Sequence, residues 1–367
     1  MGKVGVITFH ASHNYGSMLQ AYALQQTIMR IGHSCKIINL RTKEQRKLYK
    51  PFVFSSCWKA KVKALVFPFL AYADLCKHHK FEQFLSKQLF TTKEILNPEA
   101  LDECALGFDI YVSGSDQIWN TCCTDHVSSY FLDFVCDHKK IAYAPSMGPC
   151  PLQSISPKLY DFIGNALKSY HDISVRETGT ADFVEKVTGR RPKICLDPTL
   201  LLEEEEWGKL AGNKPIIEGD YILFYSPFPT NEQYREMLLI SREVGLRVVI
   251  TTANGSFKLK YKKDIKYYVD AGPLEFLNLV KYAKFVVCAS FHAVVFSIIF
   301  SRPFYAINGM SDSRVSNLLK LTKLENYALR PCEIKDTALC KIDFDIAKMN
   351  ILKAKVDSMS FLESALV

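Results

Sequence analysis

Short apolar runs alternate with amphipathic stretches along the first half of the chain. The apolar runs predict strands at residues 3–8, 35–40, 108–112, 141–144, 173–175 and 193–196. After the first of these, Met18, Leu24 and Ile28 recur at helical spacing, and Gly32 is expected to end that helix. Buried strands connected by helices indicate a parallel sheet with crossover connections.

The same layout begins again at residue 221. Further strands are expected at residues 221–225, 246–251, 284–288 and 303–307, with helices at about 231–244 and 273–282. The fold class is therefore α/β, with two successive Rossmann-like, doubly wound sheets. We place an N-terminal domain at residues 1–202, a C-terminal domain at 203–332 and a helical tail at 333–367. The tail is expected to pack back on a domain through Met349, Leu352, Val356 and Met359.

Residues 41–92 interrupt the first half with a basic and aromatic pattern that predicts an inserted pair of helices. Two interpretations stay open: a helical hairpin that packs its aromatic side chains on the domain, or a docking surface for anionic lipid head groups or a lipid-linked diphosphate. The aromatic residues concerned are Tyr49, Phe52, Phe54, Trp58, Phe67, Phe69, Tyr72 and Phe81.

Composition narrows the class of protein. Hydrophobic residues make up 48% of the chain, and 46 Lys and Arg against 38 Asp and Glu give a net charge of +8, which favours anionic partners. No nucleic-acid-binding motif accompanies this charge. The longest apolar run, residues 64–73, is far shorter than the roughly 20 residues of a membrane span, so we expect a cytoplasmic protein. The 12 cysteines include no C-x-x-C pair, and no metal site is expected.

Polar residues that follow the expected strands are the candidates for chemistry. Ser290 and His292 lie between the strand at 284–288 and the next helix, whose N-terminal N–H groups attract anions. The alternative interpretation is that a histidine at this position only caps the helix. Arg176 follows the strand at 173–175 in the same way.

Two further loops carry polar residues after strands. Residues 9–16, FHASHNYG, contribute Asn14 for hydroxyl or phosphate binding and Gly16 for close approach of a ligand. Asp116, in the segment FDIYVSGSDQIWN, is a candidate base or a helix cap, and Trp119 either stacks on a sugar or packs in the core. Because neither loop contains a G-x-G-x-x-G or Walker pattern, no dinucleotide or nucleoside triphosphate is indicated.

Four segments in series resemble the polysaccharide pyruvyl transferase family over roughly residues 3–325. They are GVITFHASHNYGSMLQAYALQQ, FDIYVSGSDQIWN, the stretch from ISVRETG to LDPTLL, and ASFHAVVFSIIFSRPF. The resemblance implies a GT-B-like fold, in which two Rossmann-like domains face each other across a cleft. It also implies transfer of a pyruvyl group from phosphoenolpyruvate to two sugar hydroxyls, which forms a cyclic ketal and releases phosphate without a separate cofactor.

The resemblance also assigns roles to residues. Arg176 and His292 match positions that bind the donor, while Ser290 and Phe291 stand where many members read Arg-Leu. We expect Arg314 to supply the missing charge. His292 is the expected proton donor and Asp116 the expected base. On the acceptor side the expected residues are Asn14, Gly16, Asp116, Gln117 and Trp119.

The implied acceptor is a sugar in a lipid-linked intermediate of bacterial capsule or exopolysaccharide synthesis, with peripheral contact at the inner membrane face. Two other functions stay open. A GT-B glycosyltransferase that uses a nucleotide sugar has the same fold. The replacement of arginine by Ser290 also suits a non-catalytic glycan-binding or assembly factor.

Overall fold

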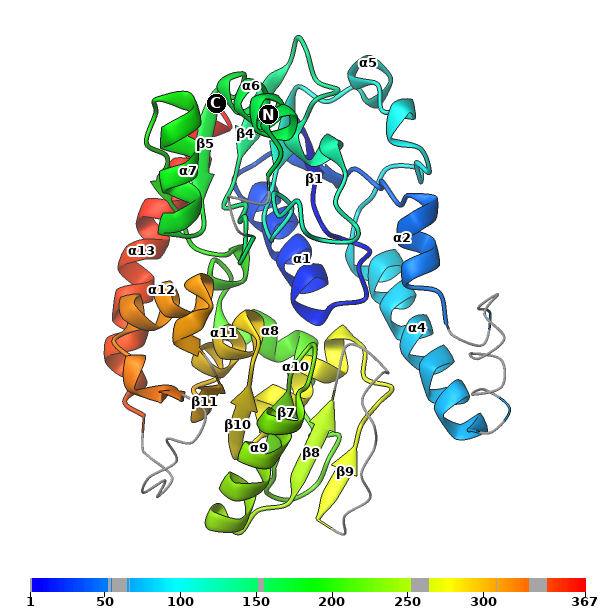
Figure 1. Cartoon of the computed structure of the whole chain (residues 1–367), viewed down its shortest axis with the longest axis vertical. Helices are drawn as coiled ribbons and strands as arrows, with labels where there is room; N and C mark the ends of the chain where they lie inside the picture. The colour runs from blue at the N-terminus through cyan, green and yellow to red at the C-terminus, as the bar shows by residue number, and fades with distance from the viewer. Residues whose placement is uncertain are drawn as a thin grey trace.

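Two parallel sheets form the framework of the chain. The structure is a computed structural model that describes residues 2–51, 54, 65, 67–150, 155–251, 264–307, 309–329 and 342–367. Each sheet contains six strands within these residues, and all the neighbouring strands run parallel. Figure 1 shows one sheet above the other, with helix α1 between them.

The N-terminal sheet has the order β2-β1-β3-β4-β5-β6. In its centre Val4 lies between Cys35 and Ile110 of the two neighbouring strands, and all three side chains are buried. The chain leaves β1 towards β2 and returns to β3 on the other side, so the crevice between β1 and β3 is where this kind of sheet binds ligands. The strands are β1 Lys3–Ile7, β2 Ser34–Ile37, β3 Ile110–Ser113, β4 Lys139–Ala142, β5 Asp172–Val175 and β6 Lys193–Ile194.

The C-terminal sheet has the order β12-β11-β10-β7-β8-β9, and its direction changes between β7 and β10. Val287 pairs with Phe224 on one side and Tyr305 on the other. The edge strands β9 and β12 contain only three and two residues, too few to make a pattern that the sequence reveals. The strands are β7 Ile222–Tyr225, β8 Val248–Thr251, β9 Ile265–Tyr267, β10 Phe285–Cys288, β11 Phe304–Ile307 and β12 Ala328–Leu329.

Helices cover both sheets and join the two domains. Tyr15, the first residue of α1, stacks on Phe276 of α10 in the C-terminal domain with ring centroids 4.6 Å apart. No described helix combines the length and apolar character needed to cross a membrane. The helices outside the insert and tail are α1 Tyr15–Arg30, α5 Glu103–Leu106, α6 Pro157–Lys168, α7 Thr178–Thr188, α8 Glu204–Ala211, α9 Asn231–Val244, α10 Pro273–Tyr282, α11 Phe291–Ile299 and α12 Ser313–Thr322.

The insert contains the helices α2 Lys43–Leu48 and α4 Pro68–Gln88. Phe81 and Phe84 bury the second half of α4 in the core, whereas Phe69 and Tyr72 in its first half are 74% and 67% exposed. The first half extends beside the C-terminal domain in Figure 1. Residues 52–53, 55–64 and 66, which include two of the expected aromatic residues, lie outside the described residues. Each interpretation of the insert therefore fits one half of α4.

The tail helix α13, Phe344–Ala365, packs on the body through a different face from the one expected. Met349, Leu352 and Val356 are 50%, 61% and 63% exposed, so that expectation is wrong for these three residues; Met359 does pack against the core. The apolar pattern of the tail has two faces, and small residues allow the other face to approach closely. The buried face consists of Phe344, Ala347, Ser358, Phe361, Leu362 and Ala365.

Helix α13 also reaches the N-terminal domain. It begins beside α12 and runs upward along the left edge of Figure 1 towards α7. The backbone N–H of Leu196 donates a hydrogen bond to Ser358 Oγ at 3.0 Å, and the Phe361 ring lies 6.4 Å from that of Tyr143. The tail thus joins the C-terminal domain to the end of β6.

Candidate active site

A cavity of about 760 Å³ lies between the two sheets, at the point where the strand order of each sheet reverses. Asn14 follows β1 and Asp116 follows β3, while Ser226 follows β7 and Ser290 follows β10, and all four residues line this cavity. Backbone geometry therefore brings polar residues from both domains to the position where open α/β sheets bind ligands.

Two arginines meet at Phe291, the first residue of α11. The guanidinium carbon of Arg176, which follows β5, lies 5.0 Å from the centroid of the Phe291 ring, and that of Arg314 lies 6.0 Å from it. Cations at these distances are attracted by the electrons of an aromatic face. Phe291 is only 4% exposed, so the ring holds two positive charges from different domains beside the cavity.

Arg176 is buried, and not all of the hydrogen-bond donors of its guanidinium group are used. Its Nη2 donates to Ser115 Oγ at 2.6 Å and lies 2.7 Å from Asp197 Oδ2, while Nη1 is 3.8 Å from Asp116 Oδ1. Nε and Nη1 are buried and have no hydrogen-bond partner among the described residues. Buried donors without partners are costly, so these two are available to an anionic ligand.

His292 lies against the same carboxylate. Its Nε2 is 3.4 Å from Asp197 Oδ2, and the Asp197 side chain is fully buried. Burial alone would raise the pKa of the Asp197 carboxyl, but the charges of Arg176 and His292 and hydrogen bonds from Thr199 outweigh it, and the pKa is held well below its usual range. Asp197 thus orients both donor-side residues.

Gly16 allows His292 to take this place. A β-carbon on Gly16 would lie 2.0 Å from His292 Nδ1, closer than any side chain tolerates. We expected Gly16 to admit a ligand to the backbone, but the structure places the imidazole ring there instead. The expectation that Gly16 contacts the acceptor is therefore wrong, because its role is to make room for His292.

Asp116 is bonded to the start of α1. Its Oδ2 accepts a hydrogen bond from Ser17 Oγ at 2.6 Å, and its φ of 75° is rare for a residue with a side chain. Asn14 is the N-cap of α1, with Oδ1 accepting from the N–H of Gly16 at 3.0 Å. The Gln117 amide oxygen accepts from Asn120 Nδ2 at 3.1 Å, and both residues line the cavity.

Trp119 does not line the cavity. It is 1% exposed, stacks on Phe131 with centroids 5.6 Å apart, and donates from Nε1 to Ser113 Oγ. The prediction that Trp119 stacks on the acceptor sugar is therefore wrong, and the alternative of a core tryptophan is correct. The chain turns after Gln117 and directs this ring into the N-terminal core.

Ser290 occupies the N-cap position of α11, but its side chain makes no capping hydrogen bond. Arg314 lies near this turn, in the first turn of α12. Its Nε and Nη2 are 3.0 Å and 2.6 Å from the two carboxylate oxygens of Asp312, which fixes the guanidinium beside Phe291. Arg314 lines the cavity, as does Ser290 itself.

Sequence reasoning overlooked several residues of this site. Asp197 follows the expected strand in the quoted segment LDPTLL, and its place after that strand was a usable signal. Ser115 also follows a strand, but only the fold shows that it meets Arg176, and the contact of Ser17 with Asp116 has no signal in the sequence. Glu177 is also buried, its Oε1 accepts from Ser146 Oγ at 2.8 Å, and burial raises the pKa of its carboxyl.

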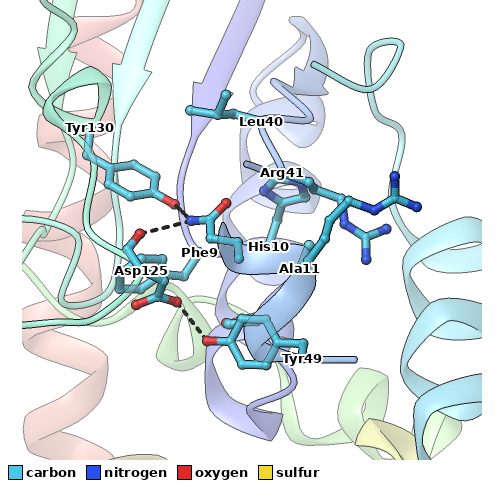
Figure 2. Close-up of a pocket in the computed structure, with 11 residues that line it drawn as sticks. Phe9, His10, Ala11, Leu40, Arg41, Tyr49, Asp125 and Tyr130 are labelled. Carbon is cyan, nitrogen blue, oxygen red and sulfur yellow. Dashed lines mark hydrogen bonds between the residues drawn. The ribbon is translucent and has the colours of Figure 1, made fainter. Parts of the chain in front are cut away.

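A small pocket of about 10 Å³ adjoins the cavity and is shown in Figure 2. The Tyr49 hydroxyl donates to Asp125 Oδ2 at 2.7 Å, and Gln45 Nε2 donates to the Tyr130 hydroxyl at 2.9 Å. Burial raises the pKa of the Asp125 carboxyl. Asp125 also lines the large cavity, so it adds a second carboxyl group there beside that of Asp116.

The two facing Rossmann-like domains, with a cavity between them, define an α/β protein of the GT-B type. Arg314 lines that cavity, and Arg176 and Arg314 both line a second pocket of about 270 Å³. A sequence model of the polysaccharide pyruvyl transferase family matches residues 14–309. The chain belongs to this family and is a transferase of polysaccharide biosynthesis. No curated protein matches the chain.

Solved structures of similar fold include S. aureus MnaA with UDP, at 10% identity and a TM-score of 0.51 over 97% of this chain and 88% of that one. UDP-GlcNAc 2-epimerase from Methanocaldococcus jannaschii is 10% identical, with a TM-score of 0.48 over 96% and 91% of the two chains. Arabidopsis thaliana UGT89C1, complexed with quercetin, is 15% identical, with a TM-score of 0.43 over 100% and 94%. At such identities the likeness to MnaA concerns the fold alone.

Proposed function

We propose that the protein transfers a pyruvyl group from phosphoenolpyruvate to two hydroxyls of a sugar, forming a cyclic ketal and releasing phosphate. One observation carries the proposal within this family: Arg176 is buried beside His292, and its Nε and Nη1 have no hydrogen-bond partner among the described residues, although Nη1 lies 3.8 Å from Asp116 Oδ1. Phosphoenolpyruvate carries a carboxylate and a phosphate, and a guanidinium binds either group through paired hydrogen bonds.

The atoms of the reaction balance as follows. One sugar hydroxyl adds to C2 of phosphoenolpyruvate while C3 gains a proton and becomes a methyl group. The second hydroxyl then displaces the phosphate from C2, so two C–O bonds to the sugar form and one C–O bond to phosphate breaks. The two hydroxyl protons are accounted for by the new methyl group and by hydrogen phosphate.

The side chains divide this work. Arg176 and Arg314 bind the donor anion, and the uncapped N-terminus of α11 at Ser290 adds backbone N–H groups. His292 gives the proton to C3, and Asp197, 3.4 Å from His292 Nε2, positions the ring. Asp116 takes the proton of the attacking hydroxyl, while Asn14 and Gln117 bind the acceptor from the other side of the cavity.

We further propose a lipid-linked acceptor of capsule or exopolysaccharide synthesis, reached at the inner membrane face. The first half of α4 supports this, because Phe69 and Tyr72 are exposed there beside a strongly basic stretch of sequence. Aromatic and basic side chains together suit the interface of an anionic membrane.

The test is acceptor-dependent phosphate release from phosphoenolpyruvate, with the mass gain of the pyruvyl ketal on the glycan as a second readout. Arg176→Lys should lower kcat/KM for phosphoenolpyruvate by about 100-fold, because lysine cannot replace the planar fork. Arg191→Lys is the matched control, since that arginine pairs on the surface with Asp182 and Glu185.

Two outcomes would contradict the proposal. A strict requirement for a sugar nucleotide would make the protein a glycosyltransferase, and tight glycan binding without any response to phosphoenolpyruvate would make it a binding factor. Full activity of both Arg176→Ala and His292→Ala would show that the site is elsewhere.

A further inference from the structure

Three side chains with metal-binding atoms meet outside the large cavity. His13 lies in the loop between β1 and α1, and His78 and Glu82 lie one turn apart on α4. One ligand atom from each residue lies within 4.8 Å of the others. His13 precedes Glu82 by 69 positions, so sequence spacing reveals only the pair on α4 and not the group of three.

The distances suit an ion better than they suit a hydrogen-bonded cluster. His13 Nε2 is 3.3 Å from Glu82 Oε1, a long hydrogen bond but about the distance between two ligands of a tetrahedral zinc ion. The rings of His13 and His78 lie 4.7 Å apart. His78 Nδ1 is buried and has no hydrogen-bond partner among the described residues, so its lone pair or proton is unused.

Among the described residues, Arg41 binds the carboxylate of this group. Its Nη1 and Nη2 are 2.9 Å and 2.6 Å from the two oxygens of Glu82. Each carboxylate oxygen has two lone pairs, so Oε1 can accept from Arg41 and still bind a metal ion. Arg41 fixes the carboxylate in place, as partners of metal ligands commonly do, but its charge also lowers the affinity for a cation.

We infer that His13, His78 and Glu82 form a site for a divalent transition-metal ion, with Zn²⁺ the best match. Two imidazoles and one carboxylate favour zinc over magnesium or calcium, which prefer oxygen ligands. Three protein ligands leave the fourth tetrahedral position to a water molecule. The His13 and Glu82 side chains are 11% and 32% exposed, so an ion reaches the site from solvent.

An ion at this place links the insert to the cavity. His13 immediately precedes Asn14, the N-cap of α1 and a residue of the cavity. The metal therefore holds the first loop of the N-terminal domain against α4, whose Lys80 pairs with Asp270 of the C-terminal domain at 2.8 Å. The site is structural, and the inference does not depend on the reaction proposed above.

The experiment titrates the metal-free, full-length protein with Zn²⁺ against a chromophoric chelator and records the visible spectrum with Co²⁺. We expect one ion per chain, a tetrahedral cobalt spectrum without a thiolate band, and a thermal midpoint that rises with zinc. His13→Ala, His78→Ala and Glu82→Gln should each lower the affinity at least about tenfold. His79→Ala, an exposed histidine next to His78, is the matched control and should bind like the wild type.

The result that overturns the inference is equal binding by the wild type and His78→Ala, or an equal loss in His79→Ala. A thiolate band in the cobalt spectrum would place the ion on cysteines instead. His13→Ala and His78→Ala are compared at matched circular dichroism, so that misfolding is not mistaken for the loss of a ligand.

Discussion

Two turns from strand to helix face each other across the cavity, and they treat the start of their helices in opposite ways. After β1, the Asn14 side chain caps α1 by accepting from the N–H groups of Gly16 and Ser17 at 3.0 and 3.5 Å. After β10, Ser290 stands at the same position of α11 and makes no such bond. The N-terminus of α1 is capped by a side chain, whereas the N-terminal N–H groups of α11 remain available to an anion. We call the turn at Asn14 the closed turn and the turn at Ser290 the open turn. We therefore expect the proposed donor to bind at the C-terminal turn.

Gly16→Ala tests whether the closed turn exists to hold His292 and should have the largest effect. The new methyl group overlaps the imidazole ring, so we expect about a 100-fold loss of kcat and about 1–3 kcal/mol of lost stability. Steady-state phosphate release and urea unfolding measure the two effects. Gly179→Ala is the control, because a β-carbon there meets no atom within 4 Å. An unchanged kcat in Gly16→Ala would show that catalysis does not depend on the space that Gly16 leaves for His292.

Asp197→Asn removes the carboxylate that lies next to His292 at the open turn. We expect the free energy of unfolding to fall by about 3 kcal/mol at neutral pH, because Arg176 loses its buried partner. The folded-state pKa of Asp197 is depressed, so its contribution is present above the unfolded value of about 3.9 and is lost as the pH falls. The difference in unfolding free energy between wild type and variant should therefore shrink below about pH 4. A constant difference down to acid unfolding would argue against the ion pair.

Ser290→Asp closes the open turn with a carboxylate. The variant should stabilise α11 by about 0.5–1 kcal/mol, because aspartate is a good N-cap, and should raise KM for phosphoenolpyruvate by about tenfold through repulsion. Thermal unfolding and substrate titration give the two numbers. Ser290→Ala should change stability little, because the serine makes no capping bond. A lower KM in Ser290→Asp would mean that the donor does not use this helix end.

Asn14→Ala opens the closed turn and should have the smallest effect. Loss of the cap should destabilise the protein by about 1 kcal/mol, and kcat/KM for phosphoenolpyruvate should fall no more than about threefold, since Asn14 lies on the acceptor side. Denaturant unfolding measures the first effect. If Asn14→Ala raised KM for phosphoenolpyruvate as much as Ser290→Asp, donor binding would depend equally on both turns.

The framework could be read from the sequence because its strands and helices have strong periodic patterns. The helix expected at about residues 231–244 is α9, Asn231–Val244, since Thr230 caps its start and Gly245 ends it. The tail was different: its apolar residues occupy two faces, and only packing decided that Ala347 and Phe361 face inward while Leu352 faces solvent. Periodicity predicts where a helix lies, whereas the elements that pack against it determine which of its faces is buried.

The candidate site was predictable only as far as single residues after strands. Arg176 and His292 follow strands and carry suitable chemistry, so their sequence positions already indicated them. The contact of Gly16 with His292, the meeting of Arg314 and Arg176 at Phe291, and the burial of Trp119 arise between distant segments. No local pattern encodes such contacts, because the first two depend on how the two domains close and the third depends on packing inside the N-terminal domain.

The bond from Leu196 to Ser358 has a consequence for the order in which the molecule is made. Synthesis begins at the N-terminus, so the loop that carries Asp197 leaves the ribosome well before α13 exists. During that interval the backbone N–H of Leu196, two residues beyond β6, lacks the Ser358 side chain that accepts its hydrogen bond. The donor side is completed only after the tail has been translated and has folded back, which makes catalytic competence a late event in the life of each new chain.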